Sequence, residues 1–531
     1  MPLPPPTNPG NMIGLSRTHG NRIMAQWSEG YVTEVEYIAD CFPELAPAHL
    51  NAALLHRGIA FPETHERFNY LELGFGQGVT LAMLAATQPQ GRFFGNDFNP
   101  SHVLGARALA ESAQLDNLTL FEDSFAELAA RDLPPMDYIV LHGIYSWVSA
   151  ENRRHIVALI RKLLKTGGVV YVSYNAQPGW APKAPMQRAM LEFAARHGAE
   201  TLAERFGAAR DFLQSLARSG AAYFAHNPVA QEQLDGLWDL NDAYLVHEFA
   251  SENWVALHHA DVVRDMAAAK LGFAGSSTLA NNFPLFSIPP DVATLYQSAE
   301  DPAMREMIRD FAVNTQFRRD IFVRGARHLE PMALDGGYRE LRVALRRPLA
   351  DCAFEARLPV GAVRLDRTIC EPILAELAKG PRSVAELAAL PALAKVDPGT
   401  CVDSVNLMLC LRYLVAIQPS EATAAAGERA RAINQAMMAR AVAGRYVAAL
   451  ASPVVGSGIE VDRGDVLFLA ARAAGESLPE FAWAALQRAG VCLTHEGKTL
   501  AGDDANLQEL RRRAAEFEQS RLTLYRMLGI A

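Results

Sequence analysis

The sequence lacks the cysteine pattern of a zinc site or a disulfide framework. Its cysteines are scattered, and none forms a C-x-x-C pair; they are Cys41, Cys352, Cys370, Cys401, Cys410 and Cys492. It also lacks an apolar run of the ~18 residues that a membrane span needs, and Met1–Gly20 contain no apolar signal-peptide core. We therefore expect a reduced, cytoplasmic protein with a flexible leader and with neither a membrane span nor a bound metal.

An excess of positive charge is also missing. The 531 residues carry a formal net charge of −9, and the pI is about 5.9. This balance argues against a general binder of nucleic acids, because such proteins present basic surfaces. Half of the residues are hydrophobic, which is enough to build the cores of the three or four domains that this length suggests.

A glycine-rich turn is the most informative feature that the sequence does contain. The apolar run Tyr70–Leu73 includes Glu72 and leads into glycines at every second position, namely Gly74, Gly76 and Gly78. A helical pattern follows over Val79–Leu84, so the segment reads as strand, tight turn and helix. Asp97 ends the next expected strand, where it can accept hydrogen bonds from the hydroxyls of a ribose.

The spacing of the glycines indicates which nucleotide the turn binds. Dinucleotide folds favour G-x-G-x-x-G, but Val79 and Thr80 follow Gly78, so the third glycine of that pattern is missing. Glu72 would also place a negative charge beside a diphosphate. S-adenosylmethionine has a ribose, a cationic amino group and a sulfonium but no phosphate, and it suits this turn better than NAD. The segment resembles the class I S-adenosylmethionine-dependent methyltransferases.

Strands and helices continue to alternate after Asp97. We expect helices at 101–114 and 151–165 and strands at 118–121, 137–141 and 169–173. Strand-like sequence returns at 270–278 and 319–323, which would close the sheet around a helical insertion. The prediction is an α/β fold with a Rossmann-like, seven-stranded core, a helical cap, and a winged-helix-like and helical C-terminal part.

The C-terminal third reads as a separate body. Helices expected near 373–377, 383–390 and 400–411 have the order of a winged helix, but the third helix carries few of the side chains that read DNA. We interpret 421–428 as a linker and 429–531 as mostly helical, with a homodimer through this C-terminal domain as the expected assembly.

The expected domains are leader and entry helices 1–66, cofactor-binding core 67–180, helical cap or regulatory insertion 181–265, closing strands 266–330, linker and winged-helix-like domain 331–420, and C-terminal helical region 421–531.

Polar and aromatic side chains follow the fourth and fifth strands, where the ligand crevice of a parallel sheet lies. Their rings could stabilise a sulfonium or an ammonium by cation–π contacts of ~0.5–2 kcal/mol each. Trp147 could equally be a packing residue, and His142 is either a general base or a cofactor contact. The candidate catalytic residues are Tyr145, His142, Trp147, Tyr174 and Trp180, with Trp27 and Tyr31 as contributors from the leader.

Histidines and acids also gather between Tyr244 and Asp261. His247-Glu248 lacks a second histidine at i+4, and the adjacent His258 and His259 point in different directions. We therefore expect a hydrogen-bonded lid segment here and not a metal site.

In this order, the motifs narrow the resemblance. Residues 25–420 are similar to bacterial methyltransferases with a methyltransferase regulatory domain, such as the protein-lysine methyltransferases that modify outer-membrane proteins. The segments that carry this similarity are Glu72–Gly78, Asn96–Pro100, Asp123–Phe125, His142–Trp147, Tyr244–Phe249 and the winged-helix-like tail. The leader departs from these enzymes, because Trp27–Tyr31 replace their Tyr-Asp-type entry segment.

The resemblance implies roles for individual residues. Glu72, Gly74, Gly76 and Gly78 would hold the methionine portion of S-adenosylmethionine, Asp97 the ribose, and Asp123 with Ser124 the adenine, while further cofactor contacts are expected from Tyr31, Phe98, Phe125 and His142. The implied reaction is methyl transfer to protein lysines. A small-molecule or glycan methyltransferase and a non-catalytic binding module remain as alternatives, and a nicotinamide oxidoreductase is a distant further one.

Overall fold

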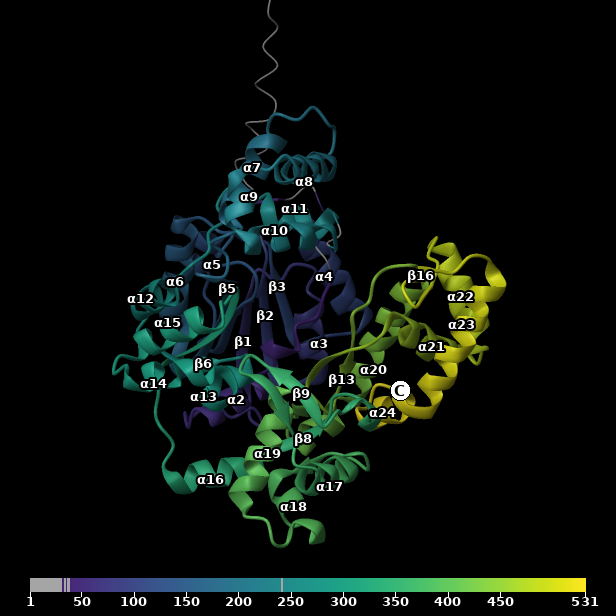
Figure 1. The fold of residues 1–531 in the computed structure, drawn as a ribbon. Coiled ribbons are helices and arrows are strands. Elements are labelled where there is room, and N and C mark those ends of the chain that lie inside the picture. The colour runs from purple at the N-terminus through teal and green to yellow at the C-terminus, as the bar shows by residue number, and fades with distance from the viewer. Residues whose placement is uncertain (1–30, 33–34, 36–38, 240–241) are drawn as a thin grey trace, which may run out of the picture.

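The computed structural model describes residues 31–32, 35, 39–239 and 242–531, and every structural statement below concerns these residues. The leader Met1–Gly20 and Trp27 lie outside them. A seven-stranded sheet forms the centre of the molecule, with the strand order β3-β2-β1-β4-β5-β7-β6 (Figure 1). Its strands are β1 Phe68–Leu73, β2 Gly91–Asn96, β3 Leu118–Phe121, β4 Met136–Leu141, β5 Leu164–Asn175, β6 Leu271–Ser276 and β7 Phe317–Arg324.

The first five strands run parallel, whereas β7 pairs antiparallel with both β5 and β6. The predicted Rossmann-like core with seven strands, including the two closing strands, is therefore confirmed. The helices between the strands begin at capping residues that the sequence supplies: Asn99 caps α4 (Pro100–Ser112), Ser124 caps α5 (Phe125–Ala130) and Ser149 caps α6 (Ala150–Leu163).

The two faces of the sheet are buried in two different hydrophobic cores. Alternate residues of a strand point to opposite faces, so Tyr70 and Tyr171 pack on one face while Leu71 and Tyr174 pack on the other. The first face is covered by α2 (Pro47–His56), α3 (Val79–Thr87) and α4, and the second by α6 and α12 (His259–Ala267). Burial on both faces explains why these strands are almost continuously apolar.

A group of helices is inserted between β5 and β6 and stands above the sheet (Figure 1). It has a hydrophobic core of its own, to which Met190, Phe206 and Phe249 contribute. The bounds are α7 Ala184–Ala194, α8 Leu202–Arg218, α9 Ala222–His226, α10 Pro228–Asp235, η2 Gly236–Asp239 and α11 Asp242–Phe249. Between β6 and β7 lie η3 Leu279–Asn282, α13 Pro284–Ser287, α14 Pro290–Ser298 and α15 Pro302–Ala312.

The next unit combines helices with small sheets. The strands β8 Arg342–Leu345, β11 Arg382–Ser383 and β12 Leu414–Ala416 pair in the order β11-β8-β12. The three expected helices appear as α17 Arg367–Leu377, α18 Val384–Ala388 and α19 Pro398–Cys410. The winged-helix class of this unit and the domain boundaries stay predictions. The remaining elements are η1 Pro43–Leu45, α16 Pro331–Glu340, η4 Leu349–Asp351, the hairpin of β9 Glu355–Leu358 and β10 Gly361–Arg364, and η5 Pro391–Leu393.

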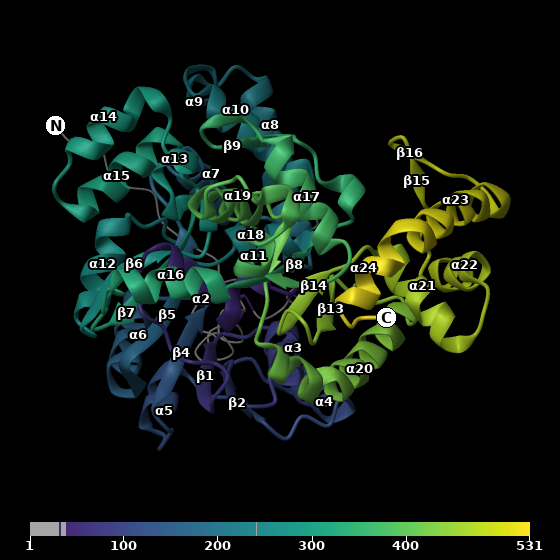
Figure 2. The ribbon, with the colours of Figure 1, turned by 90° about the horizontal axis from the view of Figure 1, so that it is seen from below.

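The expectation of a linker at 421–428 is wrong, because these residues form the first turns of α20 (Ser420–Val442). Alanine is the strongest helix former, and Ala422, Ala426 and Ala430 are buried on one side of α20. Seen from below, the C-terminal helices lie on the opposite side of the molecule from α13–α15 (Figure 2).

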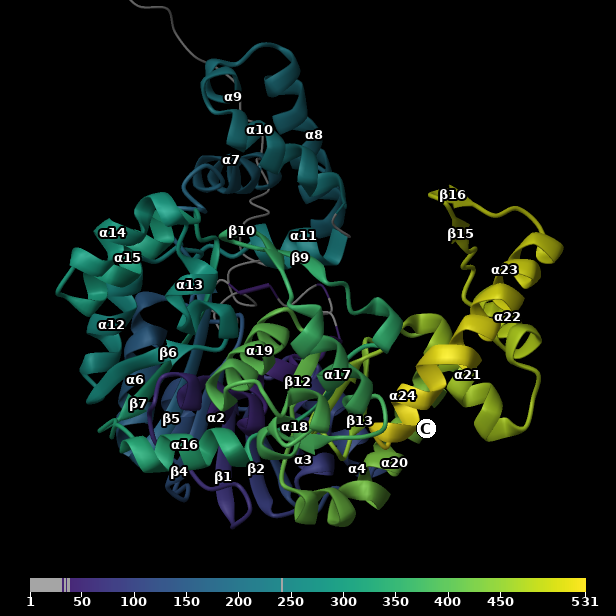
Figure 3. The same ribbon diagram turned by 60° about the horizontal axis from the view of Figure 1, so that its bottom comes forward.

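The C-terminal region also contains two hairpins that the sequence reading did not anticipate. Its further elements are β13 Ala449–Ser452, β14 Ser457–Glu460, α21 Arg463–Ala474, α22 Leu478–Arg488, β15 Thr494–His495, β16 Lys498–Thr499, α23 Asp503–Glu516, the π-helical segment η6 Phe517–Arg521 and α24 Leu522–Met527. The β15–β16 hairpin and the helices α22 and α23 stand away from the sheet (Figure 3). Among the described helices, none combines the length and apolarity that crossing a membrane requires.

Candidate active site

The glycine turn after β1 opens a cavity at the carboxyl ends of the parallel strands, here called the first cavity. Gly74 and Gly76 line it in the left-handed backbone region, with φ of 69° and 57°. A Cβ on Gly74 would lie 2.6 Å from Cγ2 of Ile144. Glycine is therefore required both by the backbone angle and by the close approach of the next loop.

Asp97 fixes the turn against the end of β2. Its Oδ2 accepts the backbone N–H of Gly76 at 2.9 Å, and its Oδ1 accepts the N–H of Asn99 at 2.9 Å. His102 Nδ1 lies 3.2 Å from the same Oδ1. The glycine turn and the end of β2 are thus hydrogen-bonded to each other through Asp97. The Asp97 carboxylate therefore has one orientation at the cavity wall.

Glu72 places a buried carboxyl group in the first cavity. Its side chain is 3% exposed, and its Oε2 has no hydrogen-bond partner among the described residues. Burial and, to a smaller extent, the nearby charge of Asp97 together raise the pKa of Glu72 to about 8. A group of this kind suits a ligand that brings a positive charge and N–H donors, because such a ligand stabilises the carboxylate.

The far wall of the first cavity combines polar and aromatic side chains. Asp123 forms an ion pair with Arg131, whose Nη2 donates to Oδ1 at 2.9 Å. Ser124 and Glu127 form a capping box at the start of α5. Phe98 and Phe125 line the cavity beside them. Flat apolar rings next to fixed acceptors match the faces and edges of a purine base.

His142 lies where the first cavity meets a neighbouring one, here called the second cavity. Its Nδ1 is 2.9 Å from the Tyr171 hydroxyl, and its ring stacks on Phe42 with centroids 3.9 Å apart. Burial lowers the pKa of His142 to about 4, although the charge of Glu44 opposes this shift. The imidazole is therefore neutral at pH 7 and adds no positive charge between the cavities.

The second cavity lies between the sheet and the inserted helices. It shares five wall residues with the first: Tyr31, Phe42, His142, Gly143 and Trp147. Its far wall carries Glu248, a residue of α11 whose Oε1 accepts a hydrogen bond from Asn175 Nδ2 at 2.8 Å. Burial raises the pKa of Glu248, and the Asn175 hydrogen bond opposes the shift. The remaining wall is rich in aromatic rings, including those of Trp180 and Phe317.

The structure brings most of the predicted residues to these two cavities. Trp147, which is 7% exposed, lines both of them, and Trp180 lines the second. The predicted cofactor residues at the first cavity are Tyr31, Glu72, Gly74, Gly76, Asp97, Phe98, Asp123, Ser124, Phe125 and His142.

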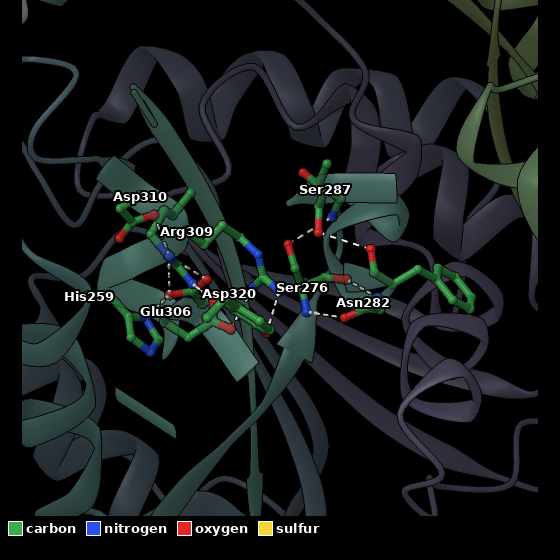
Figure 4. A network of polar contacts seen from close by, with 12 residues as sticks. His259, Ser276, Asn282, Ser287, Glu306, Arg309, Asp310 and Asp320 are labelled. Carbon is green, nitrogen blue, oxygen red and sulfur yellow. Dashed lines mark hydrogen bonds and ion pairs between the residues drawn. The ribbon is translucent and has the colours of Figure 1, made fainter. Parts of the chain in front are cut away.

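Tyr145 and Tyr174 do not reach either cavity, which corrects the expectation that they contact the acceptor. Tyr174 points to the opposite face of β5, where its hydroxyl donates to Asp320 Oδ2 at 2.5 Å. Tyr145 is fully buried in the same core, and its hydroxyl donates to Asp265 Oδ2 at 2.8 Å. Figure 4 shows Asp320 and His259 within the polar network beneath this face. Because side chains alternate between the two faces along β5, Asn175 and not Tyr174 lines the second cavity.

Gly78 does not line the first cavity either. It precedes α3 with φ of 69°, and a Cβ there would lie 2.6 Å from the Cβ of Ala106. The expected contact with the methionine portion stays a prediction, and the role that the structure shows for Gly78 is to let α3 and α4 pack closely.

Several wall residues were missed by sequence reasoning. Phe42 comes from a segment 100 positions before its stacking partner His142, and no local pattern announces this contact. Asn175 and Glu248 were visible as polar residues in the strand-five loop and the expected lid segment, but their pairing depends on the placement of α11. Within the described residues, no cluster of three or more His, Cys, Asp or Glu could hold a metal ion.

Comparisons with known proteins match the two halves of this site. A family model described as a methyltransferase domain matches residues 71–170, and one described as a predicted methyltransferase regulatory domain matches residues 241–324. An uncharacterized protein of Synechocystis sp. is 37% identical over 505 residues, which cover 95% of this chain and 100% of the relative. An uncharacterized protein of Rickettsia prowazekii is 29% identical over 41% of this chain and 86% of its own length.

Among solved structures, PKMT2 from Rickettsia typhi in complex with AdoHcy has a similar fold. The TM-score is 0.67 at 18% sequence identity, and the match covers 93% of this chain and 99% of that chain. The likeness therefore extends beyond the sheet to the inserted helices and the C-terminal region.

Proposed function

Because this chain belongs to the class I S-adenosylmethionine-dependent methyltransferases that carry a methyltransferase regulatory domain, we propose that it methylates lysine side chains of proteins. The enzyme class and the cofactor follow from the matched domains and the fold. The acceptor is the proposal, and the second cavity is the observation that carries it.

The first cavity fits S-adenosylmethionine on the chemistry of its own residues. Glu72 has the partnerless buried oxygen that an amino group would satisfy, and Asp97 has the fixed carboxylate that ribose hydroxyls would contact. We assign the adenine to Asp123, Ser124 and Phe125, which line the same cavity. When bound, S-adenosylmethionine supplies an electrophilic methyl group attached to a positively charged sulfur. The neutral His142 avoids repulsion of that charge.

The second cavity fits an ammonium-bearing acceptor. Aromatic rings stabilise a cation over their faces, and Trp147 and Trp180 stand in the wall of this cavity, which shares part of its lining with the first. The Glu248 carboxyl, held by Asn175, supplies the only acidic group on the α11 wall of this cavity among its described residues. A lysine side chain is long enough to enter such a site from a protein surface and carries the matching charge.

The residues of the second cavity favour removal of the lysine proton, which is the main energetic barrier that lysine methylation adds. With an ordinary pKa of ~10.4, a lysine amine must be neutralised before it can attack, which costs about 4.6 kcal/mol at pH 7. Removal from water disfavours the ammonium and lowers this cost. Because burial raises the pKa of Glu248, this carboxylate is a stronger base than an exposed one, and we assign it the role of accepting the proton.

A pair of glutamate variants tests this assignment. Glu248→Gln keeps the shape of the wall but removes the base, so methyl transfer to proteins should fall by at least ~100-fold while binding of S-adenosylmethionine stays unchanged. Glu252→Gln is the matched control, since Glu252 is exposed on the same segment. Full activity of Glu248→Gln would remove Glu248 from the mechanism, and label found only in small molecules would replace lysine by another acceptor.

A further inference from the structure

The chain contains very few lysines, and one of them stands inside the proposed acceptor site. Of its 50 basic Lys and Arg residues, seven are lysines, all of them within the described part of the chain. Lys183 lines the second cavity, whereas the other six line neither cavity. Those six are Lys162, Lys165, Lys270, Lys379, Lys395 and Lys498.

The surroundings of Lys183 resemble those expected for an acceptor lysine. A turn held by the Lys183 N–H to the Trp180 carbonyl, at 2.9 Å, precedes α7 and folds the side chain back over the indole. Its Nζ lies 4.2 Å from the centroid of the Trp180 ring. Burial lowers the pKa of Lys183, while the nearby charge of Glu248 opposes the shift. The amine therefore lies over an aromatic ring and within the electrostatic influence of the Glu248 carboxylate.

We propose that Lys183 is a methylation site of the enzyme itself, modified within the same molecule. This inference rests on the proposed lysine methyltransferase function. The step forms a bond between Nζ and the methyl carbon and breaks the bond between that carbon and sulfur. The amine lone pair supplies the new bond, the sulfur keeps the electron pair of the old one in S-adenosylhomocysteine, and the ammonium proton goes to Glu248 and then to water.

Mass spectrometry of the intact enzyme tests the modification. Incubation with S-adenosylmethionine should add one or more increments of about 14 Da, located by peptide mapping at Lys183. Lys183→Arg keeps the cation but should abolish the increment, while Lys395→Arg, at an exposed position, should leave it unchanged. Because the transfer is intramolecular, its rate constant should not change on tenfold dilution. A rate constant that falls on dilution, or an increment only at another lysine, overturns the proposal.

A second readout needs no S-adenosylmethionine. With lysines labelled with carbon-13 at Cε, seven NMR signals are expected, and the one missing in Lys183→Arg belongs to Lys183. This signal should titrate at a lower pH than that of an amine fully in water, because burial lowers the pKa of Lys183. Titration at the pH of an amine fully in water would overturn the proposed acceptor environment.

A parallel incubation with cell extract separates this inference from the proposed function. Methyllysine in proteins of the extract, with no increment on Lys183, would overturn the inference and leave the function standing. Methylated Lys183 together with labelled proteins supports both. Absence of methyllysine from the enzyme and from the extract overturns both.

Discussion

The protonation of Glu72 should make the binding of a positively charged ligand depend on pH. With its pKa raised to about 8 by burial and by Asp97, the carboxyl of the ligand-free protein holds a proton at pH 7. Its folded pKa lies above its unfolded value, so its contribution to stability falls as the pH rises from about 4.5 to about 8. A ligand ammonium favours the carboxylate, and binding should therefore expel this proton.

Calorimetry can count that proton. Titration of S-adenosylmethionine at pH 7 in phosphate and in Tris should give different heats, corresponding to the release of close to one proton per site. Glu72→Gln, which cannot titrate, should give equal heats in the two buffers and weaker binding. Equal heats for the natural protein would show that Glu72 is already ionised or does not meet the amino group.

Asp97 gives a separate test of cofactor binding. Asp97→Ala removes the proposed ribose contacts, and it should weaken S-adenosylmethionine binding by ~1.5–3 kcal/mol, the scale of hydrogen bonds to a charged group. Because Asp97 also holds the N–H of Gly76, unfolding of the variant should be measured alongside its dissociation constant. An unchanged dissociation constant in a folded variant would remove Asp97 from the ribose role.

Among the elements, β5, β7, α12 and α15 are joined by a buried network of ion pairs and hydrogen bonds. Figure 4 shows its members His259, Glu306 and Asp320. Arg318 on β7 contacts three carboxylates: Glu306 at 2.8 Å, Asp310 at 2.6 Å and Asp320 at 3.0 Å. Arg318→Met leaves these charges without their shared partner, so it should lower the free energy of unfolding by about 3–5 kcal/mol. Chemical denaturation measures this loss, and Arg327→Met, at an exposed position, should cost much less.

The network also predicts a pH dependence of stability. Burial by itself would raise the pKa of Asp320, but the charges of Arg318 and His259 outweigh burial and lower this pKa to about 2. A carboxyl with a lowered folded pKa stabilises the protein above its unfolded pKa, and this contribution is lost as the pH falls from about 4 to about 2. Denaturation curves of Asp320→Asn should therefore lose part of the acid dependence. Parallel pH profiles for the two proteins would contradict this role.

The elements of the core could be predicted because their signals are local. The glycines after Leu73 and the acid at Asp97 mark strand ends by residue type alone. The side to which Tyr174 points could not be read in the same way, because it depends on where the long strand β5 ends and on the polar partner Asp320 from β7. The start of α20 was missed because its Thr, Ala and Gly residues resemble a linker in sequence, whereas the packing of α20 against α3 and α4 becomes visible only in the fold.

At the scale of the whole molecule, the C-terminal region is fastened to the cofactor-binding core. Gln418 Nε2 donates to the Thr87 carbonyl at 2.9 Å and to the Pro453 carbonyl at 2.5 Å, and Gln88 Nε2 donates to the Gly456 carbonyl at 2.8 Å. The hydrophobic core runs on from the sheet into this region. The two parts should therefore unfold together.

Gln418→Ala tests that connection. It leaves two buried carbonyls without a donor, and it should lower the free energy of unfolding by about 2–3 kcal/mol in a transition that stays single. Gln487→Ala, on the exposed side of α22, is the control. Two separate transitions in the natural protein, seen by calorimetry, would contradict a shared core.

The second cavity shows what the sequence could not reveal at this scale. Its walls come from Phe42, Asn175, Lys183, Glu248 and Arg319, which lie far apart in the chain and meet only when the inserted helices fold over the sheet. In the sequence, each of these five residues is compatible with an ordinary core or surface position. The homodimer and the absence of a nucleic-acid partner stay predictions.

We propose that the enzyme as a whole transfers methyl groups from S-adenosylmethionine to protein lysines. The most direct test of this proposal is incubation of the purified enzyme with cell extract and S-adenosylmethionine labelled in the methyl group, followed by size separation and amino-acid analysis of the labelled fraction. We expect label in proteins, recovered as methyllysine, and a strong reduction of this label with Asp97→Ala and with Glu248→Gln. Label recovered only in small molecules, or in an amino acid other than lysine, would contradict it.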